Sequence, residues 1–202
     1  MAGLPRDPRQ KMINVMYLVL TAILALNVSH EVIDAFKVVD KSLITSNNNI
    51  TASNNTLYKS LEDKLTEPQS KEKAAIWEPK AMMVKSLSAN MITYIDSLKL
   101  ALKKAADLQV KWDPKTKDSV QDFREDNLDA STRMFETNGQ GKILKDRLDQ
   151  YREQILAIDP AIKAQFENSL PISTTPPVSQ EGKQKDFTQT FFHMTPTVAA
   201  LT

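Results

Sequence analysis

The chain has 202 residues, a formal net charge of +1 and no cysteine. A length of this order suits one or two domains, and the near-neutral charge gives no sign of a nucleic-acid partner. The lack of cysteine excludes disulfides, zinc–thiolate sites and iron–sulfur clusters, and a composition with only four glycines favours helices.

The first predicted helix begins at Pro8, with Asp7 as its N-cap. An uncharged run from Met12 to Ser29 follows. At about 1.5 Å per residue this run spans about 27 Å, close to the roughly 30 Å core of a bilayer, which predicts a transmembrane helix over residues 12–30. A cleaved signal peptide is one alternative, although "ALNVS" at 25–29 is a poor cleavage site. A buried helix of a soluble domain is another.

The charges on either side of this run predict its orientation. Arg6, Arg9 and Lys11 precede it, whereas Glu31 and Asp34 follow it. Basic flanks stay in the cytoplasm, so the three basic residues are read as topology determinants. We therefore expect a short cytoplasmic N-terminus over residues 1–11 and place the bulk of the chain in the periplasm.

Apolar residues continue at helical spacing after the predicted span. The first of these helices continues from the span to about Leu65, with the Asn-rich stretch 45–56 as its weakest point. Further helices are expected over about 70–111, 116–137, 142–158 and 159–170, separated by "WDPKTKD" at 112–118, "NGQG" at 138–141 and "DP" at 159–160.

The last part of the chain has a different composition. Residues 171–190, rich in Pro, Ser and Thr, read as a loop. Thr195 and Pro196 resemble an N-cap followed by a first helical residue, so residues 191–202 are expected to start a further, truncated helix of a longer natural protein. The whole pattern predicts an all-α protein, in which a single N-terminal transmembrane helix is followed by a periplasmic antiparallel helical bundle over 31–170.

The sequence contains no recognisable catalytic motif. It lacks a glycine-rich phosphate loop, a nucleophile elbow and a metal-ligand cluster. We read His30 as a polar residue at the membrane edge, His193 as a packed or capping residue, and the acidic group around Glu125 as a solvated face. We therefore expect no enzyme activity, no metal and no cofactor.

One side of the predicted transmembrane helix is small and polar. At 100° per residue, Asn14, Thr21 and Ala25 fall within about 40° of one another, Leu18 lies beside them on the same face, and Tyr17 and Ala22 lie on the flanks. Small and polar side chains let helices approach closely and form hydrogen bonds in lipid. We expect this face to contact a second copy, other spans or both, with packing unrelated to transport as the alternative.

Arg9 lies one turn before the apolar run. One reading makes it a topology determinant in contact with lipid headgroups. The other makes it the partner of a carboxylate on a neighbouring span, because an ionisable group near the hydrocarbon needs a partner or water. The run from Met12 to Ser29 contains no Asp or Glu. The acid in that second reading must therefore come from another subunit.

Two stretches resemble a known family. "PRQKMINVMYLVLTAILALNVS" at 8–29 and "FFHMTPTVAAL" at 191–201 are similar to the GldM/PorM proteins of gliding motility and type 9 secretion in Bacteroidetes. The resemblance implies an inner-membrane motor subunit driven by the proton motive force. Its homodimer would turn within a pentameric ring of GldL-like subunits and act through a periplasmic shaft on GldK/GldN-like components at the outer membrane.

The resemblance also assigns a role to one residue. Arg9 matches a family arginine thought to lie near a glutamate of the GldL-like subunit, which implies an ion pair between the two chains. The competing hypotheses are a signal-anchored periplasmic sensor that binds a ligand within its helical bundle and a passive periplasmic scaffold.

Overall fold

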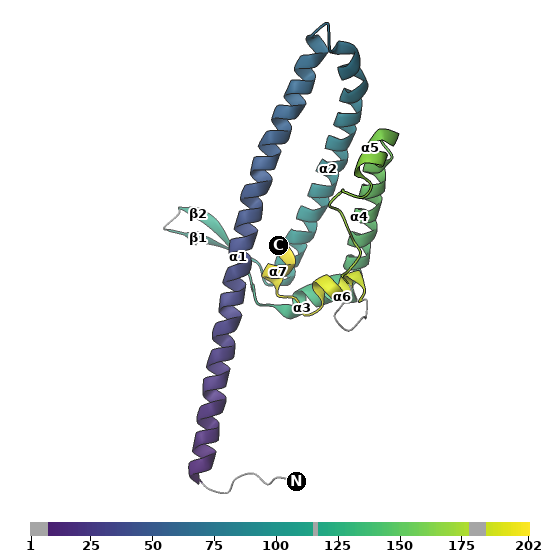
Figure 1. The fold of residues 1–202 in the computed structure, drawn as a ribbon. Helices are drawn as coiled ribbons and strands as arrows, with labels where there is room; N and C mark the ends of the chain where they lie inside the picture. Colours follow the sequence, from purple (N-terminus) through teal and green to yellow (C-terminus); the bar gives the residue numbers. More distant parts are fainter. Residues whose placement is uncertain (1–7, 115–116, 178–184) are drawn as a thin grey trace.

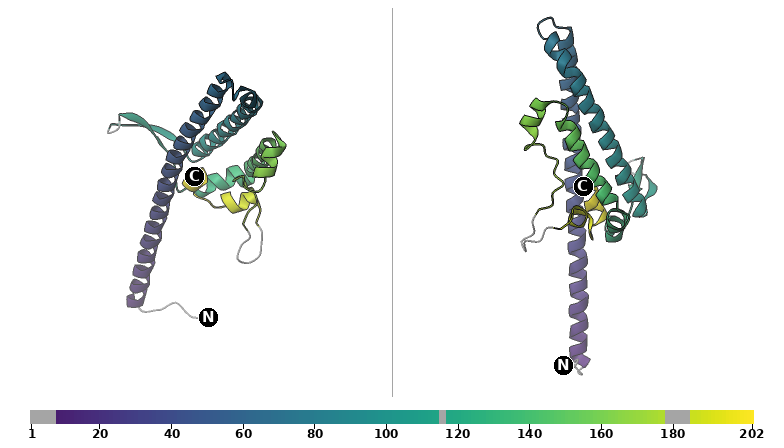
Figure 2. Two further views of the ribbon diagram at one scale, coloured as in Figure 1. Left: turned by 45° about the horizontal axis from the view of Figure 1, so that its top comes forward. Right: turned by 90° about the vertical axis from the view of Figure 1, so that its right-hand side faces the viewer.

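A long helical hairpin forms most of the molecule. The computed structural model describes residues 8–114, 117–177 and 185–202, except the side chains of residues 22–29. Helix α1 (Pro8–Thr66) runs to a tight turn, and α2 (Lys71–Ala105) returns beside its upper half. The N-terminal part of α1 extends beyond the rest of the protein in every view (Figures 1 and 2).

Helix α1 is continuous from Pro8 to Thr66, so the predicted start at Pro8 is confirmed, and its expected cap Asp7 lies outside the described residues. The Asn-rich stretch does not interrupt it. Within this stretch the hydroxyl of Thr45 donates to the carbonyl of Lys41 at 2.9 Å. A bond of this kind keeps the hydroxyl from competing with the helical backbone pattern. Each Asn lowers helix stability by roughly a few tenths of a kcal/mol relative to Ala, and a long helix stays formed because helix formation is cooperative.

The second helix ends earlier than the sequence predicts, at Ala105 instead of about residue 111. Helix α2 stops at Ala105, and Asp107 adopts a left-handed φ of 62° that ends the helical path. Strands β1 (Gln109–Asp113) and β2 (Asp118–Asp122) then form an antiparallel hairpin in which Lys111 pairs with Val120. The all-α prediction is therefore correct for most of the chain and wrong for this hairpin.

The expected helix over 116–137 is also wrong in its first half. Helix α3 (Leu128–Ser131) begins where the Asn127 side chain accepts hydrogen bonds from two backbone N–H groups, and it continues as the π-helix η1 (Thr132–Thr137). Capping at Asn127 fixes the start, because an Asn side chain satisfies the N–H groups that a helix leaves free at this end.

Helices α4 (Gln140–Leu156) and α5 (Pro160–Phe166) follow close to their predicted starts. Gly139, with a φ of 74°, separates η1 from α4 in a conformation that glycine adopts without strain. Asp159 accepts a hydrogen bond from the N–H of Ala161, which confirms the cap expected from "DP". Helix α5 ends about one turn earlier than expected.

The C-terminal segment packs into the body. It forms α6 (Phe187–Phe192), which was not predicted, and α7 (Thr197–Leu201), which starts close to the expected Thr195–Pro196. The ring of Phe192 stacks on that of Phe135 with centroids 3.9 Å apart. These helices share one buried cluster with α2, α3 and η1: Leu98, Leu102, Ala106, Ala130, Met134, Phe135, Phe187, Phe192 and Leu201.

Candidate functional site

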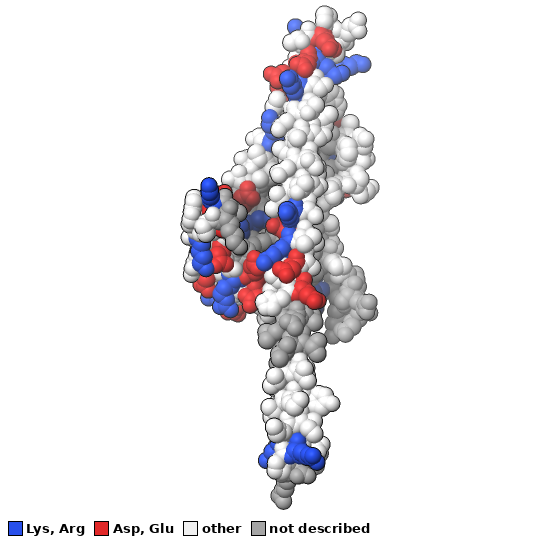
Figure 3. Space-filling view, turned by 90° about the vertical axis from the view of Figure 1, so that its left-hand side faces the viewer, with Lys and Arg blue, Asp and Glu red and all other residues white. Residues whose placement is uncertain are grey.

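The N-terminal part of α1 presents apolar side chains to its surroundings. Every residue from Pro8 to Thr21 is exposed, including Met12 at 73% and Leu18 at 72%. The basic residues Arg9 and Lys11 lie in the first turn, and Figure 3 shows basic side chains at the lower end of α1 with an uncharged surface above them. This part of α1 therefore has no apolar contact partner among the described residues.

The described residues include no helix long and apolar enough to cross a membrane. The predicted span, residues 12–30, contains 22–29, whose side chains lie outside the described residues. The side chains of Ala22 and Ala25 and the whole of Arg6 also lie outside the described residues.

The remaining residues of the predicted contact face lie on one continuous helix. Asn14, Tyr17 and Thr21 are all exposed, and the Thr21 hydroxyl donates to the carbonyl of Tyr17 at 2.7 Å. This internal bond satisfies the hydroxyl donor, so Thr21 does not need a partner to donate to, and its oxygen remains free to accept. The amide of Asn14 has no such bond among the described residues.

Arg9 points away from this contact face. At 100° per residue it lies about 140° from Asn14 and on the same side of α1 as Met16 and Leu20. No described residue forms an ion pair with Arg9. The helix therefore offers two separate faces, one small and polar and one carrying the arginine.

A junction connects the free part of α1 to the body. Ile33 is only 7% exposed, and α1 packs against α7 as well as α2. The Nζ of Lys37 lies 2.6 Å from Oε2 of Glu125. The hydrogen bond that the Lys37 ammonium donates to this carboxylate raises the pKa of Lys37 above its ordinary value. Glu125, expected to be simply solvated, therefore links the body to α1.

The loop that carries Glu125 also holds α7. The carbonyl of Glu125 accepts from the N–H of Val198 at 3.1 Å, and that of Asn127 accepts from both the N–H and the hydroxyl of Thr197. Nearby, Nδ1 of His193 lies 2.7 Å from Oε2 of Glu136. The loop with Glu125 and Asn127 therefore contacts both α1 and α7.

Replacing Glu125 with Gln should destabilise the protein by less than about 1 kcal/mol, because both partners are partly exposed. Since the pKa of Lys37 is raised, the contribution of the pair should persist at neutral pH and disappear as the pH rises through that pKa. Urea denaturation at low and high salt measures it, and salt should shrink the difference from the wild type. A loss unaffected by both salt and pH would show that the ion pair is not its cause.

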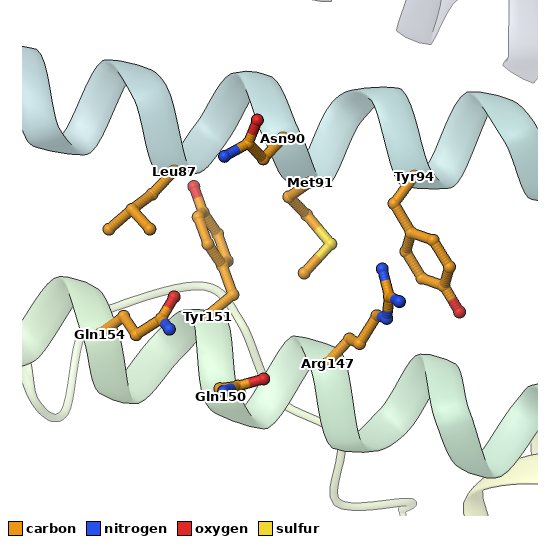
Figure 4. Close-up of a pocket in the computed structure, with 8 residues that line it drawn as sticks. All are labelled: Leu87, Asn90, Met91, Tyr94, Arg147, Gln150, Tyr151 and Gln154. Carbon is orange, nitrogen blue, oxygen red and sulfur yellow. The ribbon is translucent and has the colours of Figure 1, made fainter.

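A groove between α2 and α4 is a concave feature that the sequence did not indicate (Figure 4). It has a volume of about 350 Å³. The guanidinium of Arg147 lies 4.0 Å from the ring centroid of Tyr94, and the hydroxyls of Ser88 and Tyr151 are 2.8 Å apart. Such contacts hold α4 on α2 and leave Arg147 without an ion pair among the described residues.

These features define a helical protein whose compact body stands on a long, partly unsupported apolar helix with a basic start. The family model of the GldM N-terminal domain matches residues 31–202. The chain belongs to this family, and the resemblance seen in the sequence is confirmed. The family is a membrane-associated component of the gliding motility and type 9 secretion machinery. A search of curated proteins found no match.

Proposed function

We propose that this chain is a subunit of a proton-driven motor in the bacterial inner membrane. In this proposal α1 crosses the membrane once, with its N-terminus in the cytoplasm and the body in the periplasm. The observation that carries it is α1 itself, which passes without a break from an exposed apolar part with basic residues at its start to a part fixed on the body. Any movement of the lower part is therefore transmitted to the body.

The proposed partners are those that the family resemblance implies, and the two faces of α1 suit them. The face with Asn14, Tyr17, Thr21, Ala22 and Ala25 suits close packing against a second copy. The Arg9 face would then point outward, toward a surrounding ring of GldL-like subunits, for which the family resemblance suggests a pentamer. Energy would pass through the periplasmic part to GldK/GldN-like components at the outer membrane.

Arg9 acts electrostatically in this proposal. A guanidinium stays charged at all relevant pH values, so it favours the ionised form of a carboxyl beside it. Protonation of that carboxyl from the periplasmic side weakens the pair and frees Arg9 to engage the next acid of the ring. The two helices of a dimer cannot match five acids symmetrically, so each acid is in turn paired and unpaired.

Purification of the tagged chain from native membranes tests the proposed partnership. We expect a small polytopic membrane protein with a glutamate in one of its spans to co-purify. A tagged variant that starts at residue 31 and carries a cleavable export signal is the control, and it should lose this protein while keeping its fold. Equal recovery with both forms would contradict a contact through α1.

The groove between α2 and α4 is the one observation that suits the alternative of a periplasmic sensor. In that case a small anionic compound would bind beside Arg147 and raise the melting temperature, and Arg147→Gln would remove the effect. If the groove between α2 and α4 serves only packing, the compound would not change the melting temperature.

A further inference from the structure

Two hollows along one face of α2 form a single trough. The first is the groove between α2 and α4, of about 350 Å³, and the second, of about 540 Å³, lies between α2 and the segment of α3 and η1. Tyr94 lines both hollows, and Leu87, Tyr94 and Ala101 fall within about 40° of the helix circumference. From Leu87 to Ala105 this α2 trough is about 27 Å long, at about 1.5 Å per residue.

The walls of the α2 trough carry polar groups with unused hydrogen-bonding capacity. Asn90, Gln150 and Gln154 are exposed in the first hollow, and no hydrogen bond joins their amides to other described residues. The hydroxyl of Tyr94, where the two hollows meet, is buried and has no hydrogen-bond partner in the described part of the chain. Because a buried hydroxyl is unfavourable without a partner, this part of the trough favours a bound polar group.

The charge of the α2 trough is positive. Its described lining contains Arg133 and Arg147 but no Asp, Glu or Lys. The guanidinium of Arg147 lies over the ring of Tyr94 and has no ion pair within the described chain (Figure 4). Arg133 has one exposed contact of 3.4 Å with Asp129. Exposed pairs of this kind are weak, so both guanidinium groups are available to a carboxylate that enters the trough.

The shape and the chemistry of the α2 trough suit an extended peptide. An extended chain presents an unpaired N–H and C=O at each residue to the amides of the walls, whereas a helix satisfies its own backbone. Sugar rings bind by stacking on aromatic faces, but Arg147 already covers the ring of Tyr94, with its guanidinium 4.0 Å from the ring centroid. A trough of about 27 Å holds about eight extended residues at about 3.3 Å each.

We infer that the α2 trough binds an extended, acidic peptide segment of a partner protein. Carboxylates of the segment pair with Arg147 in the first hollow and Arg133 in the second. The amides of Asn90 and Gln150 bond to its backbone, and its apolar side chains lie on the floor of the trough. The trough does not depend on the proposed function, but the location of this partner in the periplasm rests on it.

Selection from a random library of eight-residue peptides tests this inference on the purified full-length chain in detergent. The wild type should enrich peptides that are rich in Asp and Glu. Arg147→Gln should weaken binding of an enriched peptide about tenfold, because a charged hydrogen bond becomes a neutral one. The matched control Lys142→Gln removes the same charge from an exposed position about 140° around α4, and it should bind like the wild type.

A second variant keeps the inference testable if Arg147→Gln fails to fold. Asn90→Ala removes an exposed amide from α2 and leaves the guanidinium in place, and it should weaken the same peptide about threefold. Binding unchanged in Asn90→Ala and Arg147→Gln, or weakened equally by Lys142→Gln, would overturn the inference.

The source of the ligand and the proposed function are tested separately. Enrichment of neutral or basic peptides, or of none, overturns the inference. Retention of the chain on purified peptidoglycan sacculi that is lost in Arg147→Gln also overturns it, because the trough would then bind the cell wall. If peptide binding fails while the small membrane protein still co-purifies with the chain, the inference falls and the proposed motor stands.

Discussion

Alanine at position 9 should abolish gliding and type 9 secretion while leaving the protein at its normal level in the membrane. Arg9 is exposed in the first turn of α1 and makes no ion pair within the described chain, so its removal should not affect folding. In the proposed motor it supplies the only charge that engages the acids of the ring. Secretion assays and immunoblots of membranes measure the two effects separately.

Lys11 provides the matched control for this experiment. It carries the same charge in the same exposed turn but lies about 160° around the helix from Arg9. Lys11→Ala should therefore retain most activity, and Arg9→Lys should be intermediate because an ammonium keeps the charge without the planar geometry. Normal secretion by Arg9→Ala, or equal loss with Lys11→Ala, would contradict a specific role for Arg9 in the motor cycle.

Phe192→Ala should cost roughly 3–5 kcal/mol of unfolding free energy. Phe192 is 8% exposed and stacks on the 3% exposed Phe135, so its loss leaves a cavity between α6 and η1. Thr197 and Val198 follow closely in the chain, so the same substitution should loosen the connection between α7 and the junction. Chemical denaturation of the purified chain in detergent measures the free energy.

The neighbouring Phe191 is the natural comparison, because it has the same side chain in the same helix but is 44% exposed. Phe191→Ala should cost well under half as much, since less apolar surface is removed from the core. Similar losses at both positions would mean that the C-terminal segment does not belong to the core.

The sequence predicted best the parts of the fold that depend on local patterns. The continuous stripe from Val32 to Leu65 predicted α1, and the "DP" and "NGQG" signals marked real helix ends. The β-hairpin was missed because Val110 and Val120 also fit an apolar helical spacing, and no periodicity decides between the two over such short runs. Asp107 adopts the left-handed conformation that ends α2 before the hairpin, and the sequence around it does not predict this conformation.

The junction could not have been found from the sequence. Lys37 and Glu125 are far apart along the chain and resemble ordinary solvated residues, and only the folded body brings them within 2.6 Å. Helix α6 could not be predicted from the sequence either, because its six residues are too few to show a helical periodicity. The free part of α1, by contrast, was apparent from composition alone, since an uncharged apolar run needs no tertiary context to be recognised.

The proposed motor requires α1 to carry the chain across the inner membrane as one continuous helix. Single cysteines at Gln10 and Asn48, both exposed in α1, test this with a membrane-impermeant maleimide on cells whose outer membrane is permeabilised. The predicted result is that Asn48→Cys is labelled in intact cells and Gln10→Cys only after lysis. Labelling of Gln10→Cys in intact cells, or protection of both positions, would contradict it.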